Sequence, residues 1–431
     1  MARLKVVIIN KSDSLGGAAV VSMRLLNALC NKGVEAHMLV TDRRSDSPLV
    51  EMAGPKWKIK WNFLLERLLV FILNCFNIKT LFNIDPAITG LPLWKNRRVK
   101  EADAIILGWV NQGMLSLKGI KKIQELGKPV IWTMHDMWCM TGICHHAGSC
   151  TRFHENCGCC PLLGIFKSKA DISRITWNKK NTTYGKEING KLGDPVFGAV
   201  SNWLAQKGRE SRLLRHRRIE VIPNPFHLEK RVLKPPFDPD RITIVFGAAR
   251  LDDPIKGLDI LIDMTRVLAA DFPEIAAKAR LITFGGIKNP ALLDEFAISH
   301  RHLGMVRGEK EIRKIYEEAD ILVSSSSYES LPGTLVEAQA YGCVPVSFNQ
   351  GGQSDIVTHL STGYLADWGD NPELRPRKLA EGVAWAVSVI ENENSRAEIV
   401  EKMRRNVMQR FEASAVAQKY IDLIRDLQMF H

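Results

Sequence analysis

Short apolar runs rich in β-branched residues alternate with longer amphipathic stretches along the first half of the chain. The first run covers residues 4–9 and leads through a loop with Gly16 and Gly17 to an apolar periodic stretch at residues 18–30. This order predicts a doubly wound sheet, because buried parallel strands are apolar and their crossover connections are helices. Further strands are expected at residues 36–40, 104–107, 129–134, 196–200 and 219–222.

The same pattern starts again after a proline-rich stretch. Five prolines between residues 223 and 240 are typical of an interdomain linker. Beyond it we expect strands at residues 242–246, 281–284, 321–323 and 344–347, with helices at residues 257–268 and 334–341.

The 431 residues therefore suit two domains better than one. We predict an α/β protein with two Rossmann-like doubly wound domains, residues 1–224 and 225–410, facing a central cleft. Residues 411–431 carry Val416, Tyr420 and Leu423 on one helical face, which predicts a helix that packs back on the N-terminal domain.

The charge of the chain indicates an anionic partner. Lys and Arg outnumber Asp and Glu by 59 to 47, a formal net charge of +12, which suits nucleic acid, an acidic membrane face or a phosphorylated substrate. A membrane-spanning helix needs about 20 consecutive apolar residues, and no such run is present. The N-terminus has no signal-peptide pattern, so the expected location is cytoplasmic, with peripheral contact at the inner face of the cell membrane as an option.

Two glutamates flank a predicted helix start in the second half. Glu329 follows the strand at residues 321–323, Pro332 suits the first turn of a helix, and Glu337 lies about one turn further in. We expect the backbone N–H groups at this helix start to point outward, where they could bind phosphate. They belong to Gly333, Thr334 and Leu335. A carboxylate at Glu337 could accept hydrogen bonds from a ribose diol, and Glu329 could hold sugar hydroxyls. The alternative is helix capping and ordinary surface charge.

A basic pair follows the strand at residues 242–246. Arg250 and Lys256 could together neutralise a diphosphate leaving group. The alternative is a pair of ordinary surface cations.

The order of these motifs resembles that of the retaining GT-B glycosyltransferases, a large family that builds bacterial polysaccharides. The motifs are Gly16-Gly17, His135-Asp136, Arg250 with Lys256-Gly257, Glu329 with Glu337-Ala338, and Gly351-Gly352. The resemblance covers nearly the whole chain. It implies transfer of a hexose-type sugar from a UDP- or GDP-sugar to a saccharide acceptor, soluble or lipid-linked, in surface polysaccharide biosynthesis.

The resemblance also implies a role for each matched residue. Gly16 and Gly17 let the first loop approach the donor diphosphate, and Arg250 and Lys256 bind that diphosphate. The other implied contacts are those of Glu329 and His135 with the donor sugar and of Glu337 with the ribose. The chemistry needs no metal and no protein nucleophile. One departure is Gly108-Trp109, where close relatives often carry His-Trp.

Six of the nine cysteines lie between Cys139 and Cys160. A subgroup of these glycosyltransferases carries a similar insert, here at about residues 139–161. We predict a structural zinc ion held by Cys144, Cys150, Cys157 and Cys160, since four thiolates suit tetrahedral zinc. Alternative ligands are His145, His146, His154, Cys139 and Cys159. The other interpretation is a loop of reduced, partly buried cysteines.

A basic amphipathic segment lies in the N-terminal half. Lys56, Lys58 and Lys60 alternate with Trp57 and Trp61 just ahead of an apolar run at residues 63–73. This composition is typical of a helix that lies on a membrane surface. The alternative is a helix buried against the N-terminal sheet.

Two rival functions predict other sequence features. A nucleotide-sugar epimerase of the same fold should show paired active-site histidines and carboxylates, which the sequence does not show. A zinc-containing nucleic-acid-binding protein should concentrate its basic residues in one module, whereas here they are spread over both halves. We therefore expect no nucleic-acid partner.

Overall fold

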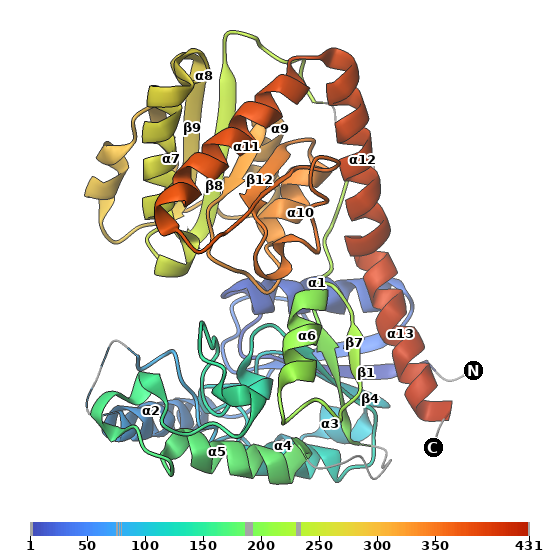
Figure 1. Cartoon of the computed structure of the whole chain (residues 1–431). Coiled ribbons are helices and arrows are strands. Elements are labelled where there is room, and N and C mark those ends of the chain that lie inside the picture. The colour runs from blue at the N-terminus through green and yellow to red at the C-terminus, as the bar shows by residue number, and fades with distance from the viewer. Residues whose placement is uncertain are drawn as a thin grey trace. The chain divides into compact units, whose positions relative to one another are not determined.

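The computed structural model describes residues 3–74, 76, 78, 80–185, 193–229 and 234–429. The chain divides into two compact units, which Figure 1 shows as a cartoon. The amino-terminal unit consists of residues 1–226 and 413–431, and the carboxyl-terminal unit of residues 227–412. The carboxyl-terminal helix α13 (Ala413–Met429) thus belongs to the amino-terminal unit.

The amino-terminal unit is built on a seven-stranded parallel sheet with the order β3-β2-β1-β4-β5-β6-β7. Its strands are β1 (Lys5–Ile9), β2 (Glu35–Val40), β3 (Val50–Met52), β4 (Ala104–Leu107), β5 (Val130–Met134), β6 (Pro195–Ala199) and β7 (Ile219–Val221). Val6 of β1 pairs with Ala36 on one side and with Ala104 on the other. The strand order therefore reverses at β1, which places the ligand-binding edge at the carboxyl ends of β1 and β4.

Helices cover both faces of this sheet. They are α1 (Gly17–Asn31), α2 (Lys56–Leu73), α3 (Arg97–Glu101), α4 (Leu117–Gln124), α5 (Ile172–Lys180), α6 (Asn202–Glu210) and α13. Helix α13 packs against α1, and Leu25 of α1 shares a core with Val416 and Tyr420 of α13. The Tyr420 hydroxyl also lies 2.8 Å from Thr133 Oγ1 of β5. Both apolar and polar contacts therefore fix α13 to this sheet.

The carboxyl-terminal unit repeats the design with a six-stranded parallel sheet of order β10-β9-β8-β11-β12-β13. Its strands are β8 (Ile242–Arg250), β9 (Ala279–Gly286), β10 (Ser299–His302), β11 (Ile321–Ser324), β12 (Val344–Phe348) and β13 (Tyr364–Ala366). Its helices are α7 (Leu258–Asp271), α8 (Pro273–Lys278), α9 (Glu309–Glu318), α10 (Gly333–Ala340), α11 (Arg375–Ile390) and α12 (Glu393–Phe411). Its core joins the central strands to α7 and α11.

These two parallel sheets with their helices confirm the predicted α/β class and the two Rossmann-like units. The pattern missed the short edge strands β3, β10 and β13. Strand β10 reads Ser-His-Arg-His, and edge strands of this kind lack the apolar run that marks a central strand. No helix in the part of the chain that the structure describes combines the length and the apolar character needed to cross a membrane.

Candidate functional site

Two loops at the carboxyl edge of the second sheet are joined through their backbones. Strands β8 and β11 are neighbours, so the loops that follow them start at the same edge. The short helix η6 (Pro254–Lys256) lies in the first loop. The Ser327 amide donates to the Ile255 carbonyl at 2.9 Å, and Ser325 Oγ donates to the Lys256 carbonyl at 2.9 Å. The position of Lys256 is thereby fixed relative to the loop after β11.

Gly257 makes this approach possible. Its φ of +65° lies in the left-handed region, and a Cβ atom there would lie 2.3 Å from the Ser325 carbonyl oxygen. Any side chain would force the two loops apart. Glycine is therefore required beside Lys256 by close packing as well as by its dihedral angle.

The two loops bring two of the predicted site residues into direct contact. Lys256 Nζ forms an ion pair with Glu329 Oε1, and Ser326 Oγ donates to the same oxygen at 3.1 Å. The Lys256 and Glu329 side chains are 24% and 21% exposed, so the pair is accessible to a ligand. Ser326 was missed by sequence reasoning, since a serine in a run of four carries no motif signal.

A glycine turn supports Glu329 from behind. The Gly352 amide donates to the Glu329 carbonyl at 2.7 Å, and a Cβ at Gly351 would lie 2.5 Å from the same oxygen. Gly351 also has a left-handed φ of +62°. The Gly351-Gly352 motif therefore sets the backbone on which Glu329 stands.

Arg250, at the end of β8, has partners that the sequence analysis missed. Its guanidinium lies 2.9 Å from Asp253 and 3.6 Å from Asp252, and its side chain is 41% exposed. The backbone carbonyl of Asp253 also accepts a hydrogen bond from the Lys256 amide at 2.8 Å. Asp253 thus contacts both residues, Arg250 through its carboxylate and Lys256 through its backbone, while the Lys256 side chain is paired to Glu329.

Helix α10 begins at Gly333, directly after Pro332. The Leu335 amide donates to the Pro332 carbonyl at 3.2 Å, and its side chain is buried, so the predicted outward N–H of Leu335 is already used. Gly333 and Thr334 are half-buried at the helix start. Burial, and after it the charge of the Glu337 carboxylate, raises the pKa of Tyr316.

The amino-terminal unit has its own pocket at the carboxyl edge of its sheet, which we call the Gly16 pocket. It has a volume of about 560 Å³, and its lining includes Lys11, Gly16, Gly17, Asp42, Phe63 and Trp109. Gly16 has a φ of +85° and precedes α1. The two glycines thus line a pocket at the switch point of the sheet, as the strand order requires.

His135 follows β5 and is neutral at neutral pH, because burial lowers its pKa to about 4. Its neighbour Asp136 accepts hydrogen bonds from Trp109 Nε1 at 2.9 Å and His145 Nδ1 at 2.7 Å. Burial opposes ionisation of Asp136, but His145 lowers the pKa of that carboxyl to about 2. Asp136 therefore orients Trp109 and engages His145, which had been an alternative zinc ligand.

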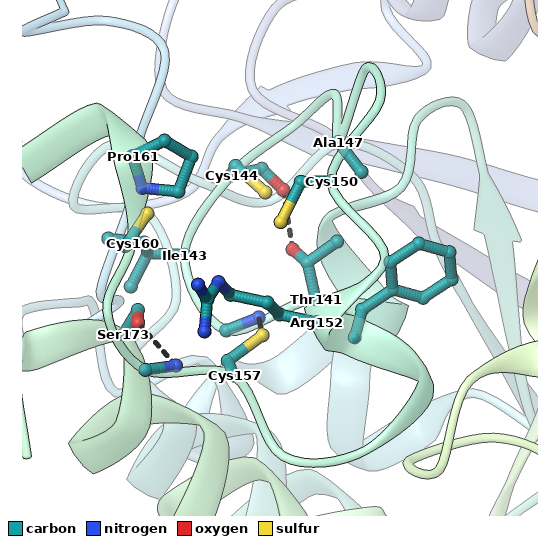
Figure 2. A pocket seen from close by; sticks show the side chains of 13 residues that line it. Thr141, Ile143, Cys144, Ala147, Cys150, Arg152, Cys157, Cys160, Pro161 and Ser173 are labelled. Carbon is teal, nitrogen blue, oxygen red and sulfur yellow. Dashed lines mark hydrogen bonds between the residues drawn. The ribbon is translucent and has the colours of Figure 1, made fainter. Parts of the chain in front are cut away.

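The four cysteines of the predicted zinc site line one small pocket. Figure 2 shows Cys144, Cys150, Cys157 and Cys160 around it, and the Gly142 amide donates to Cys157 Sγ at 3.2 Å. All four thiols are unoxidised. Among the described residues, no three His, Cys, Asp or Glu side chains are placed so that together they could hold a metal ion. The residues converge, but the site is not preformed, and zinc binding stays a prediction.

The chain is similar to known glycosyltransferases in sequence. Residues 241–380 match the family Glycosyl transferases group 1, a segment that contains Arg250, Lys256, Glu329 and Glu337. The amylovoran biosynthesis glycosyltransferase AmsK of Erwinia amylovora is 26% identical over 235 residues, covering 51% of this chain and 56% of that protein. The glycogen synthase of Pseudomonas paraeruginosa is 30% identical over 118 residues, covering 26% of this chain and 21% of that enzyme. This chain therefore spans only part of the length of these curated relatives.

The fold is shared with solved glycosyltransferase structures over nearly the whole chain. Sucrose-phosphate synthase from Thermosynechococcus elongatus superimposes with a TM-score of 0.60 at 16% identity, covering 100% of both chains. Anabaena HepE in complex with UDP-glucose gives 0.57 at 16% identity, covering 98% of this chain and 100% of the other. The fold is thus the GT-B fold of these glycosyltransferases. The carboxyl-terminal unit of this chain carries the group 1 signature.

A neutral His135 predicts a specific pH dependence of stability. Between pH 4 and 6.5 the unfolded chain binds a proton at this position that the folded chain does not, so the free energy of unfolding should rise with pH across that window. The variant His135→Asn should flatten the rise. Urea unfolding followed by tryptophan fluorescence measures it, with the exposed His216→Asn as the matched control. Asp136 changes the free energy of unfolding only below this window, because its stabilising effect is lost as the pH falls from 3.8 to about 2. Equal slopes in wild type and His135→Asn would contradict the assignment.

The convergent cysteines predict about one zinc ion per chain in protein purified without chelator. Elemental analysis of wild type and of a Cys157→Ser/Cys160→Ser variant measures it, and the variant should lose the metal. Cys30→Ser, on helix α1 away from the pocket, should retain it. Wild-type protein that holds no stoichiometric metal and whose four thiols all react freely would show that the cluster is a reduced loop.

Proposed function

We propose that the protein is a retaining glycosyltransferase that moves a hexose-type sugar from a UDP- or GDP-sugar to a saccharide acceptor in surface polysaccharide biosynthesis. The observation that carries the proposal is the Lys256–Glu329 pair, held beside the start of α10 by the packing of Gly257 on Ser325. The family match over residues 241–380 supports it, as do the names of AmsK and of the HepE complex with UDP-glucose.

The two members of the Lys256–Glu329 pair suit two different parts of a nucleotide sugar, the diphosphate and the sugar ring. Lys256 can transfer its ion pair from Glu329 to the donor diphosphate, and Arg250, now paired with Asp253, can add a second cation. Glu329 is then free to accept hydrogen bonds from the sugar hydroxyls. The N–H groups of Gly333 and Thr334 at the start of α10 suit the phosphate, and Glu337 suits the ribose diol.

The proposed reaction needs no residue that becomes covalently attached. The bond between the anomeric carbon and the diphosphate oxygen breaks, and both electrons of that bond stay on the diphosphate. The acceptor hydroxyl oxygen forms the new bond on the same face of the sugar, and its proton passes to the departing diphosphate oxygen. Lys256 and Arg250 favour this step because they stabilise charge that grows on the leaving group. A neutral His135 can hydrogen-bond a sugar hydroxyl without adding charge.

The ribose role of Glu337 predicts weaker nucleotide binding in Glu337→Ala. Hydrogen bonds to a charged group contribute about 1.5–3 kcal/mol each, so the Kd for the preferred nucleotide should rise at least about tenfold. Calorimetry with UDP and with GDP measures the change. Glu318→Ala removes an exposed carboxylate at the end of α9 and should leave the Kd unchanged. Unchanged affinity in Glu337→Ala, in protein that melts like the wild type, would remove Glu337 from the ribose site.

Helix α2 supports the proposal of a lipid-linked acceptor, because its polar side chains are buried and its large apolar side chains are exposed. Its buried side chains are Asn62, Glu66, Arg67 and Val70. Arg67 pairs with buried Asp85 at 2.8 Å, and Glu66 accepts the Thr89 amide at 2.8 Å. The exposed apolar residues, spaced three or four apart, are Trp57, Trp61, Leu64, Leu68 and Ile72. We call this row the α2 stripe. It argues against the alternative of a helix buried by its apolar face.

We assign the α2 stripe to the interface of an anionic membrane leaflet, where a lipid-linked acceptor would lie. Trp57 and Trp61 are 71% and 63% exposed, and large apolar side chains in a continuous row are typical of an interaction surface. Lys56, Lys58 and Lys60 flank the stripe at its amino-terminal end. Cations beside interfacial tryptophans match the charge of an acidic leaflet.

The stripe predicts co-sedimentation with phosphatidylglycerol vesicles and not with phosphatidylcholine vesicles at low salt. Trp57→Ser/Trp61→Ser should lower this binding at least about tenfold, because the buried apolar area of two tryptophans is lost. The substituted side chains are exposed, so the fold should be unchanged. Met305→Ser/Leu360→Ser, which removes two exposed apolar side chains from the carboxyl-terminal unit, is the matched control. Wild-type protein that stays in solution with the anionic vesicles would refute the assignment.

A further inference from the structure

A second pocket of the amino-terminal unit lies beside the Gly16 pocket and is strongly cationic. We call it the Arg43 pocket. It has a volume of about 410 Å³, and the lining residues that matter here are Lys11, Asp42, Arg43, Lys56, Lys60 and Phe63. They come from the loops after β1 and β2 and from the first two turns of α2. Four cations therefore face one cavity that has a single acidic lining residue, Asp42.

That single carboxylate does not neutralise the four cations. Asp42 forms an ion pair with Arg44 at 3.1 Å and accepts a hydrogen bond from Ser12 Oγ at 3.2 Å. Within the described residues, no carboxylate lies within 4.0 Å of Lys11, Lys56 or Lys60. The pocket therefore presents an excess of positive charge to whatever enters it.

Lys11 is the most constrained of these cations. Its Nζ donates to the Gln112 carbonyl at 2.9 Å and lies 5.3 Å from the centre of the Phe63 ring. Burial lowers its pKa to about 8, so the folded protein holds this charge at a cost. Asp85 and Asp42 oppose this effect from a distance, and an anion in the pocket would give Lys11 a direct ion pair.

A pocket of the carboxyl-terminal unit that also contains two lysines on one helix is different. Lys310 and Lys314 of α9, four residues apart like Lys56 and Lys60, line a pocket of about 700 Å³. That pocket also contains the carboxylates of Glu229, Glu309, Glu317 and Glu412. Its charges are balanced within the protein, whereas those of the Arg43 pocket are not.

The position of the Arg43 pocket indicates what the anion belongs to. Lys11, Asp42 and Phe63 line both the Arg43 pocket and the Gly16 pocket, so the two cavities adjoin. Lys56 and Lys60 lie on α2 next to Trp57 and Trp61 of the α2 stripe. Along one side of the unit the order is thus an apolar stripe, a cationic pocket and a second pocket with the Gly16-Gly17 loop.

We propose that the Arg43 pocket binds a phosphate or diphosphate group of the acceptor, with Lys11, Arg43, Lys56 and Lys60 as its cationic partners. The assignment to the acceptor rests on the proposed glycosyltransferase function, whereas anion binding by the pocket does not. Two sources carry this chemistry: a diphosphate linked to a membrane lipid, and a soluble sugar phosphate.

Binding of inorganic pyrophosphate to the full chain tests the pocket. The titration is made in a Lys256→Ala background, so that the proposed donor site contributes little. Adding Lys56→Gln/Lys60→Gln should raise the Kd at least tenfold, and Lys56→Arg/Lys60→Arg should restore it. Lys310→Gln/Lys314→Gln, which removes the same charge from the balanced pocket, should change nothing. An equal Kd with and without Lys56→Gln/Lys60→Gln, in protein with wild-type melting behaviour, overturns the proposal.

The source of the phosphate is separated with phosphatidylcholine vesicles that carry a polyprenyl diphosphate or the matching polyprenyl alcohol. Binding that needs the diphosphate, depends on Lys56 and Lys60 and exceeds the affinity for free pyrophosphate supports a lipid-linked acceptor. Lysine-dependent binding of free pyrophosphate with no gain on vesicles supports a soluble one. The proposed donor site is tested independently, by the effect of Lys256→Ala on nucleotide binding and turnover.

Discussion

The backbone contact between the loops after β8 and β11 is the constraint on which the candidate donor site depends. Neighbouring parallel strands end at one edge, but their loops meet only because Gly257 has no side chain opposite the Ser325 carbonyl. That approach holds Lys256 against Glu329, and the Gly351-Gly352 turn holds Glu329 from the other side. The ion pair is therefore prepared by backbone packing before any ligand arrives, which is how a binding site avoids the cost of ordering its groups on binding.

A comparable arrangement fixes helix α2 in the amino-terminal unit. Asp85 accepts hydrogen bonds from Arg67 on α2 and from the Gln112 amide, and the Gln112 carbonyl accepts from Lys11. A buried ion pair of this kind contributes little net stability, but it specifies one orientation of the helix. That orientation turns the apolar row outward and places the lysines of the first turns over the Arg43 pocket. The α2 stripe, the Arg43 pocket and the Gly16 pocket thus depend on the same polar network.

Much of the fold could be predicted from the sequence, because central parallel strands leave a clear apolar pattern. The strand at residues 104–107 was predicted with the bounds that β4 has, and the start of α10 was displaced by one residue. The edge strands β3 and β10 were missed because their faces are not both buried. For the candidate site, motif order brought Lys256 and Glu329 to attention, but not Ser326 or Asp253, whose roles come from contacts that no local pattern encodes. The same limit applies to α2, because sequence pattern gives a helix its apolar row but not the direction that row faces.

The central claim, that Lys256 and Glu329 form the donor site, is tested most directly by nucleotide release. Purified protein is incubated with a panel of UDP- and GDP-sugars, and free nucleoside diphosphate is measured for wild type and Lys256→Ala, with the exposed Lys278→Ala on α8 as the control. We expect one donor to be turned over by wild type and by Lys278→Ala. Loss of a preorganised charge at the leaving group costs about 100- to 1,000-fold, so Lys256→Ala should be slower by at least two orders of magnitude. Equal rates for wild type and Lys256→Ala, or a wild type that turns over none of the nucleotide sugars, would contradict the account.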